Sequence, residues 1–141
     1  MKQEELEALA AKLGALLLAN GEKLATAESC TGGWVAQCLT AISGSSDWFE
    51  RGFVTYSNEA KQEMLGVEPE TLLKHGAVSE TTASAMAAGA LRHSHANWAL
   101  SITGIAGPGG ATDDKPVGLV YIACMRRGHE PVIERHVFTG D

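Results

Sequence analysis

The sequence has few cysteines and fewer basic than acidic residues. The first shortage argues against a disulfide scaffold, and the second argues against a nonspecific nucleic-acid binder. Only three cysteines occur in 141 residues, and an odd number at wide spacing fits reduced thiols in a cytosolic protein better than a disulfide scaffold. The formal net charge is −6, whereas nonspecific nucleic-acid binders are usually basic. We therefore expect a cytoplasmic protein without a nucleic-acid partner, in which a locally positive site can still hold a small anion.

The chain also lacks long apolar runs. Its longest candidate, residues 13–19, is much shorter than the roughly 20 residues of a membrane-spanning helix and lies inside an amphipathic pattern. The first residues, Met1-Lys2-Gln3-Glu4-Glu5, are acidic and do not have the layout of a signal peptide. With 45% apolar residues, residues 1–141 are expected to form a single domain with its own core and no membrane partner.

Segments typical of strands alternate with segments typical of helices. Leucines at helical spacing predict a first helix that ends near Asn20-Gly21. Apolar and β-branched runs predict strands over 24–27, 53–57, 98–103, 117–125 and 132–138. Helical patterns predict helices over 33–42, 59–65, 69–74 and 80–93. Asn58 is the expected N-cap of the helix at 59–65, and Ser79 that of the helix at 80–93. This alternation predicts a three-layer α/β/α fold with a mixed, mostly parallel sheet and a C-terminal antiparallel hairpin.

Ser29 is the most informative residue because it joins a predicted strand to a predicted helix. It follows the strand at 24–27, and Gly32-Gly33 precede the helix. A hydroxyl at this place faces the backbone N–H groups of the helix start. Ligands and nucleophiles of α/β proteins gather at such carboxyl ends of strands. Ser29 can therefore attack a substrate, bind a ligand or cap the helix, and these three roles remain open.

A serine nucleophile needs a base, and histidine is the usual one. The five histidines lie near helix ends, in a turn and in the last strand, and no Cys, His or Asp cluster has metal-site spacing. We therefore expect no metal. Lys61 is the best alternative base because it lies in the first turns of a short helix, where the helix dipole lowers the pKa of a lysine. A solvated helix lysine is the more common case.

Three other side chains near Ser29 and Lys61 each have two possible roles. Cys30 is a rival nucleophile, since a thiol at a helix start can have a depressed pKa, or a small buried side chain. Glu28 orients a base or accepts helix N–H groups. Tyr56 donates to a substrate oxygen or packs within its strand. Lys115 is a candidate contact for an anion.

A second glycine-rich segment, Thr103–Gly110, follows another predicted strand. It ends in no Gly-Lys-Ser/Thr and opens no helix, so it is neither a Walker A loop nor a dinucleotide fingerprint. Its glycines predict a backbone that approaches a ligand closely, or else a flexible connection.

Five motifs together resemble the CinA C-terminal-domain family of nicotinamide-nucleotide amidases. They are Glu28–Gly33, Gly52–Lys61, Gly76–Glu80, Thr103–Gly110 and Lys115–Gly118. They stand in the family's order and cover nearly the whole chain. The resemblance implies hydrolysis of the carboxamide of nicotinamide mononucleotide to nicotinate mononucleotide and ammonia, with no cofactor.

The resemblance also implies roles for individual residues. Ser29 would be the nucleophile, Lys61 its base and Tyr56 an assisting hydroxyl. Ser46 and Thr103 would be polar site residues. Backbone N–H groups at Thr31, Gly32 and Gly33 would hold the oxyanion, and the loop with Gly104, Gly107, Gly109 and Gly110 would cradle the nucleotide.

Members of this family are expected to continue past Phe138-Thr139-Gly140-Asp141 into a final helix that supplies a site arginine. A chain ending at Asp141 is then expected to bind substrate more weakly and to expose an apolar face, and we expect a homo-oligomer. Two alternatives remain open. One is a nucleotide-binding module of the same fold without activity, and the other is a thiol enzyme that uses Cys30.

Overall fold

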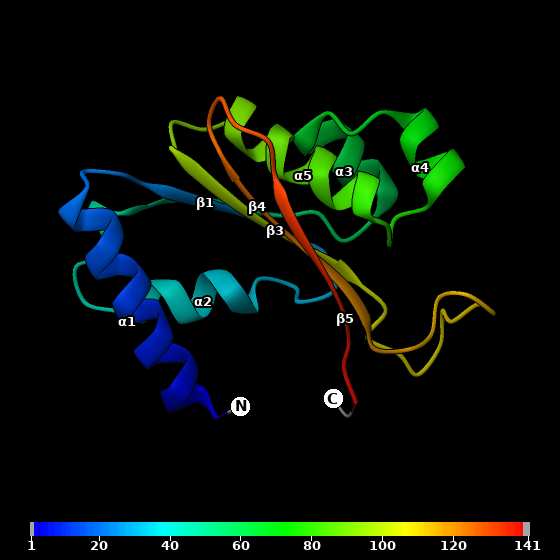
Figure 1. Ribbon diagram of the computed structural model, residues 1–141, viewed down its shortest axis with the longest axis horizontal. Coiled ribbons are helices and arrows are strands. Elements are labelled where there is room, and N and C mark those ends of the chain that lie inside the picture. The colour runs from blue at the N-terminus through cyan, green and yellow to red at the C-terminus, as the bar shows by residue number, and fades with distance from the viewer. Residues whose placement is uncertain (1, 140–141) are drawn as a thin grey trace.

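The computed structural model describes residues 2–139, which form a five-stranded sheet with helices on both faces (Figure 1). The elements, in chain order, are α1 (Gln3–Ala19), β1 (Leu24–Glu28), α2 (Trp34–Thr40), the 3-10 helix η1 (Ser45–Asp47), β2 (Phe49–Val54), α3 (Asn58–Leu65), α4 (Pro69–His75), α5 (Glu80–Arg92), β3 (Trp98–Gly104), β4 (Leu119–Arg126) and β5 (Val132–Val137). Residues 140 and 141, the last two of the motif after which the family's final helix was expected, lie outside the described part. No described helix is both long and apolar enough to cross a membrane.

The strands are ordered β2-β1-β3-β4-β5. β1 pairs in parallel with β2 and β3, and β4 pairs antiparallel with β3 and β5. Within residues 2–139, four strands therefore share one direction and β4 runs against them, so the predicted mixed, mostly parallel sheet and its closing hairpin are confirmed. The carboxyl ends of β1, β2 and β3 consequently meet at one edge.

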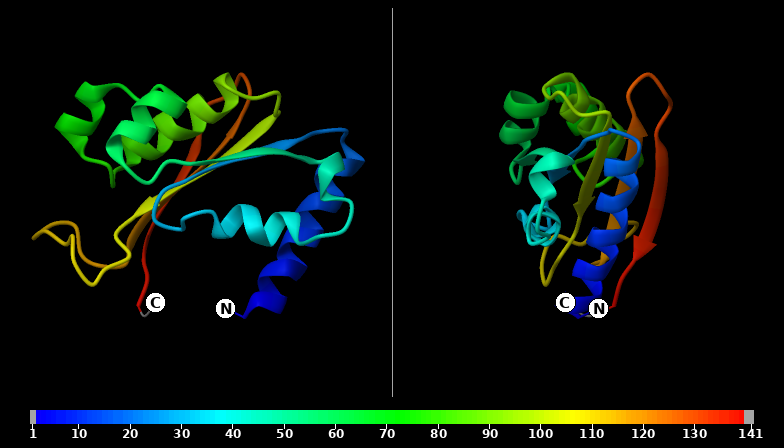
Figure 2. Two further views of the ribbon diagram at one scale, coloured as in Figure 1. Left: turned by 180° about the vertical axis from the view of Figure 1, so that it is seen from behind. Right: turned by 90° about the vertical axis from the view of Figure 1, so that its left-hand side faces the viewer.

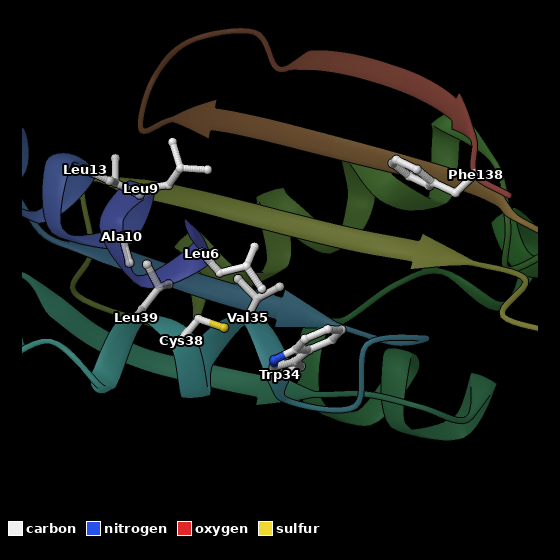
Figure 3. A pocket seen from close by; sticks show the side chains of 9 residues that line it. All are labelled: Leu6, Leu9, Ala10, Leu13, Trp34, Val35, Cys38, Leu39 and Phe138. Carbon is white, nitrogen blue, oxygen red and sulfur yellow. The ribbon is translucent and has the colours of Figure 1, made fainter. Parts of the chain in front are cut away.

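Two apolar clusters hold the three layers together. On one face, α3, α4 and α5 pack on the sheet around fully buried Met86 and Leu65. On the other face, α1 and α2 pack around Trp48 and Leu24. Figure 2 shows the two helical layers on opposite sides of the strands. On the α1–α2 side an apolar hollow of about 490 Å³ remains, between these helices and Phe138 (Figure 3).

Of the boundaries that differ from the sequence-based expectations, two bear on the site. β2 spans Phe49–Val54 rather than 53–57, because its pairing with β1 starts at Phe49 opposite Leu24. Ser57, not Asn58, caps α3, since its side chain accepts a hydrogen bond from the N–H of Ala60. Residues 55–57 thus leave the sheet at its carboxyl edge, and their carbonyl groups become available to other partners.

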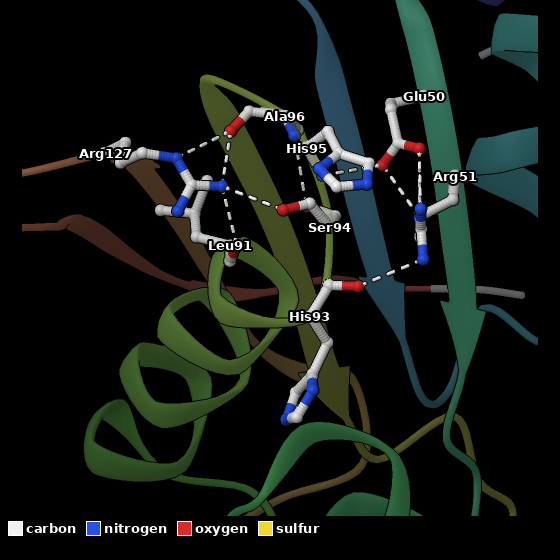
Figure 4. A network of polar contacts seen from close by, with 8 residues as sticks. All are labelled: Glu50, Arg51, Leu91, His93, Ser94, His95, Ala96 and Arg127. Atoms are coloured by element: carbon white, nitrogen blue, oxygen red, sulfur yellow. Dashed lines mark hydrogen bonds and ion pairs between the residues drawn. The ribbon is translucent and has the colours of Figure 1, made fainter.

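Polar contacts fix the opposite edge, where α5 returns to β3 (Figure 4). The guanidinium of Arg127 donates to the carbonyl oxygens of Leu91 and Ala96. Arg51 pairs with Glu50 and also donates to the carbonyl of His93. The carbonyl groups of Leu91 and His93 lie at the C-terminal end of α5, where a helix leaves carbonyls free, and that of Ala96 lies in the segment before β3. These contacts anchor the sheet at the edge that lies far from Ser29.

Candidate active site

Ser29 lies in a tight turn between β1 and α2. Its N–H donates to the carbonyl of Ile102 on β3 at 3.0 Å, and its carbonyl accepts from the N–H of Gly32 at 3.1 Å. Gly32 and Gly33 have φ angles of 58° and 103°, a left-handed region that glycine adopts without a side-chain penalty. The two glycines therefore let the chain reverse directly after Ser29, whose side chain is buried.

Lys61 reaches this turn from α3. Its Nζ lies 2.9 Å from Ser29 Oγ, 2.9 Å from the Thr55 carbonyl and 3.1 Å from the Tyr56 carbonyl. Lys61 is 1% exposed, and no carboxylate in residues 2–139 forms an ion pair with it. Burial lowers the pKa of Lys61 from its usual value, because an apolar surrounding disfavours the charged form.

This arrangement suits proton transfer between the two side chains. A neutral lysine amine has two N–H donors and one lone pair. The two carbonyl groups can take the N–H donors, and the lone pair then faces the Ser29 hydroxyl. A base at hydrogen-bond distance is the requirement for activating a serine nucleophile.

Ser29 and Lys61 open into a cavity of about 280 Å³ at the carboxyl edge of the sheet. Its walls come from the turn after β1, the segment after β2, the loop before α5 and the loop after β3: Ser29, Cys30, Tyr56, Lys61, Ala77, Val78, Thr103, Gly104, Ile105, Ala106, Gly107, Gly109 and Gly110. The cavity thus brings together Ser29, Lys61, Tyr56, Thr103 and the four glycines singled out in the sequence.

Thr103 and Tyr56 contribute to this cavity in different ways. The Thr103 hydroxyl is buried and donates to the carbonyl of Ala77 at 2.8 Å, so it holds two walls of the cavity together. The Tyr56 side chain is 74% exposed at the mouth. The carbonyl of Tyr56, rather than its phenol, contacts Lys61.

Other expected site residues do not line the cavity. Ser46 is exposed in η1, which leads into the start of β2 and so lies toward the opposite edge of the sheet. The Thr31 hydroxyl donates to Glu28 Oε1 at 2.6 Å, and the N–H of Gly32 is engaged in the Ser29 turn. Of the three amides expected to hold an oxyanion, that of Gly32 therefore already has a partner.

Glu28 and Cys30 each take one of the two roles left open for them. The Glu28 carboxylate accepts hydrogen bonds from the N–H groups of Val35 and Ala36, each at 2.9 Å. Of the two alternatives for Cys30, the structure favours the buried side chain: burial raises the pKa of this thiol, and the Glu28 charge raises it further. Burial outweighs the backbone hydrogen bonds that lower this pKa, which favours Ser29 over Cys30 as the nucleophile.

Several residues at the site have side chains that indicate no chemistry by themselves. Thr55 matters through its carbonyl, a group that every residue has. Ala77, Val78 and Ala106 are small apolar side chains that are typical of any core. Their place in the cavity wall follows from the folded chain, which puts them in the same cavity as Ser29. The lysine and the glycines were recognisable because their side chains, or the lack of one, have chemical consequences.

The described residues offer few alternatives to this pair. No group of three or more His, Cys, Asp or Glu side chains in residues 2–139 could hold a metal ion. The hydrogen-bond partners of the Ser29 hydroxyl there are Lys61 Nζ and the Tyr56 carbonyl, and no imidazole is among them.

Comparison with known proteins identifies the family of this chain. The model of the CinA C-terminal domain matches residues 6–141. The chain belongs to the CinA C-terminal domain family. The nicotinamide-nucleotide amidohydrolase PncC of Escherichia coli K12 is 54% identical over 141 residues, which are 100% of this chain and 86% of that protein. A CinA-like protein of Syntrophobacter fumaroxidans is 53% identical over 134 residues, 95% of this chain but 31% of its own length.

Solved structures of CinA proteins have the same fold. The competence/damage-inducible protein CihA of Agrobacterium tumefaciens superposes with a TM-score of 0.92 at 49% identity, covering 95% of this chain and 81% of that chain. A CinA superfamily protein of Klebsiella pneumoniae superposes with a TM-score of 0.90 at 41% identity, covering 100% of this chain and 86% of that chain. The three-layer architecture is therefore that of the CinA family.

Proposed function

We propose that this protein is an amidohydrolase that converts the carboxamide of nicotinamide mononucleotide to the carboxylate and releases ammonia. The observation that carries the proposal is the 2.9 Å contact between Ser29 Oγ and the buried amine of Lys61. The name of the Escherichia coli relative, an amidohydrolase of nicotinamide nucleotides at 54% identity, supports the choice of substrate.

The chemistry follows from the two side chains. The neutral Lys61 amine takes the hydroxyl proton as Ser29 Oγ attacks the amide carbon, and the carbonyl oxygen becomes an oxyanion. Lys61 then gives that proton to the departing amide nitrogen, so that ammonia leaves and an ester on Ser29 remains. Water attacks this ester, again with proton transfer through Lys61, and restores the serine. Such a Ser-Lys pair is a variant of the serine triad.

The cavity walls suit a nucleotide. Gly104, Gly107, Gly109 and Gly110 line one side, and glycines let the backbone N–H groups come close to a ligand. The Tyr56 phenol at the mouth is free to contact the substrate. We assign the nicotinamide ring and its carboxamide to the end of the cavity beside Ser29, and the sugar phosphate to the glycine loop.

The experiment is an ammonia-release assay on nicotinamide mononucleotide with the wild type and Ser29→Ala. The wild type is expected to release ammonia. Ser29→Ala is expected to lower kcat by about 10⁶-fold, to background, as in other serine hydrolases that lose the nucleophile. Ser43→Ala, which removes an exposed hydroxyl outside the cavity, is the matched control and should retain full activity.

Two results would contradict the proposal. Ammonia release by Ser29→Ala at the wild-type rate would remove Ser29 from the chemistry. Tight binding of the nucleotide by the wild type without any release would instead support a binding module. Calorimetry on the wild type and on Ser29→Ala distinguishes these results.

A further inference from the structure

Glu28 is a buried carboxylate next to the nucleophile. It is 1% exposed and forms no ion pair within residues 2–139. Its oxygens instead accept three hydrogen bonds, from the Thr31 hydroxyl at 2.6 Å and from the N–H groups of Val35 and Ala36 at 2.9 Å. A buried charge without its bonds is very costly, so this carboxylate depends on all three.

These bonds connect the two ends of the Ser29 turn. The Glu28 backbone is fixed in the sheet, because its carbonyl accepts from the N–H of Thr55 at 2.8 Å. Its side chain is fixed to the start of α2. The turn between these points includes Gly32 and Gly33, both with positive φ, and glycine has the greatest backbone freedom of any residue. Without the carboxylate, the Thr31 side chain and the first N–H groups of α2 would lose their contacts to the end of β1.

The Glu28 charge also occupies the start of α2. A helix start attracts negative charge, and here the chain supplies that charge itself. The N–H groups of Val35 and Ala36 are therefore unavailable to a negative oxygen in the cavity. Lys61 becomes the nearby cation once it has taken the Ser29 proton, while negative charge develops on the substrate carbonyl oxygen. The reaction therefore requires Ser29 Oγ and Lys61 Nζ to stay at hydrogen-bond distance.

We propose that Glu28 is a positioning residue, which keeps Ser29 Oγ within proton-transfer distance of Lys61 by tying Thr31 and the start of α2 to the end of β1. The inference rests on the proposed function, in which Ser29 is the nucleophile. Glu28 acts on the reaction only through the geometry of the turn.

The test measures the reactivity of Ser29 directly, with a fluorophosphonate probe that phosphonylates activated serines. Glu28→Gln keeps the size of the side chain but turns one acceptor into a donor, so at least one of the three bonds is lost. We expect the rate constant of Ser29 labelling to fall by at least about tenfold, since a misplacement of about 1 Å can lower a rate about 100-fold. In the ammonia assay, kcat should fall while KM stays unchanged.

Thr31 provides a matched pair that does not disturb the bonds to α2. Thr31→Val removes the hydroxyl bond and should slow labelling, whereas Thr31→Ser keeps the hydroxyl and should restore the wild-type rate. This pair decides the question even if Glu28→Gln fails to fold. Circular dichroism and thermal unfolding check that each variant is native at the assay temperature.

The outcomes separate this inference from the proposed function. If Glu28→Gln and Thr31→Val lower the melting temperature but label at the wild-type rate, Glu28 is only a helix cap and the inference is overturned. If the wild type itself neither labels at Ser29 nor releases ammonia, the proposed function fails, and the inference fails with it.

Discussion

At the scale of single residues, Lys61 shows how position decides chemistry. Its sequence context fits an ordinary surface lysine equally well, and most helix lysines are solvated. In the folded chain it is buried against two carbonyl groups and Ser29 Oγ. Ser29 was recognisable from the turn chemistry around it, and Lys61 was the best candidate base. The sequence alone could not decide between a base and a solvated lysine, because the contact spans 32 positions of the chain.

The first prediction concerns the pH dependence of catalysis. Lys61 must be neutral to accept the Ser29 proton, and burial lowers its pKa from the usual 10.5. We expect kcat/KM for ammonia release to rise with pH and to level off with a midpoint below 10.5. Lys61→Met should lower kcat by about 10²–10⁴-fold, the range typical of a lost general base, and should lose this rise. A wild-type midpoint at or above 10.5 would mean that another group is the base.

At the scale of elements, much of the fold could be predicted and the site could be predicted only in part. The local signals were sufficient for the helices and for most strands, because caps and periodicity act within a few residues. Strand order acts over long distances. The order β2-β1-β3 places the segment after β2 and the glycine loop after β3 on either side of Ser29. Nothing local in the sequence specifies that order, and for the same reason the place of Ser46 could not be predicted.

The second prediction concerns the contact between α3 and α5. A Cβ at Gly89 of α5 would overlap the Leu65 carbonyl of α3, which also accepts a hydrogen bond from Arg92 at 3.0 Å. An alanine usually stabilises a helix by about 1 kcal/mol over glycine. Here Gly89→Ala should instead lower the free energy of unfolding by about 1–3 kcal/mol, because backbone must move.

Gly14→Ala in α1 is the comparison for Gly89→Ala in urea unfolding. Its added Cβ would overlap Cε2, Cζ2 and Nε1 of the Trp48 ring, and a side chain can shift more easily than a backbone carbonyl. We therefore expect a smaller loss at Gly14. An equal or larger loss at Gly14 would show that the close approach of α3 and α5 is not the dominant constraint.

A shift of α3 would also move Lys61, so Gly89→Ala should slow ammonia release as well.

At the scale of the whole molecule, the site is held in a conformation that reduces the stability of the fold. Lys61 is buried without a carboxylate partner in residues 2–139, and desolvation of a cation opposes folding. The unfolded chain solvates the same lysine fully. The packing of the two apolar clusters therefore has to offset the desolvation cost of Lys61. This cost depends on pH, because only the charged lysine incurs it.

The last prediction follows from this dependence. Because the pKa of Lys61 is lower in the folded state than its usual 10.5, the unfolded state binds more protons between these two values. Stability then rises with pH in that window, by at most about 1.4 kcal/mol per pH unit for one group. Below the folded-state pKa the desolvation cost is fully present, and above 10.5 it is gone. Urea unfolding of the wild type and Lys61→Met at a series of pH values isolates this effect, because every other group titrates in both proteins. The stability of the wild type relative to the variant should increase as the pH rises. A constant or decreasing difference would mean that the pKa of Lys61 is not lowered in the folded state. Such a lysine would stay charged and could not serve as the base for Ser29.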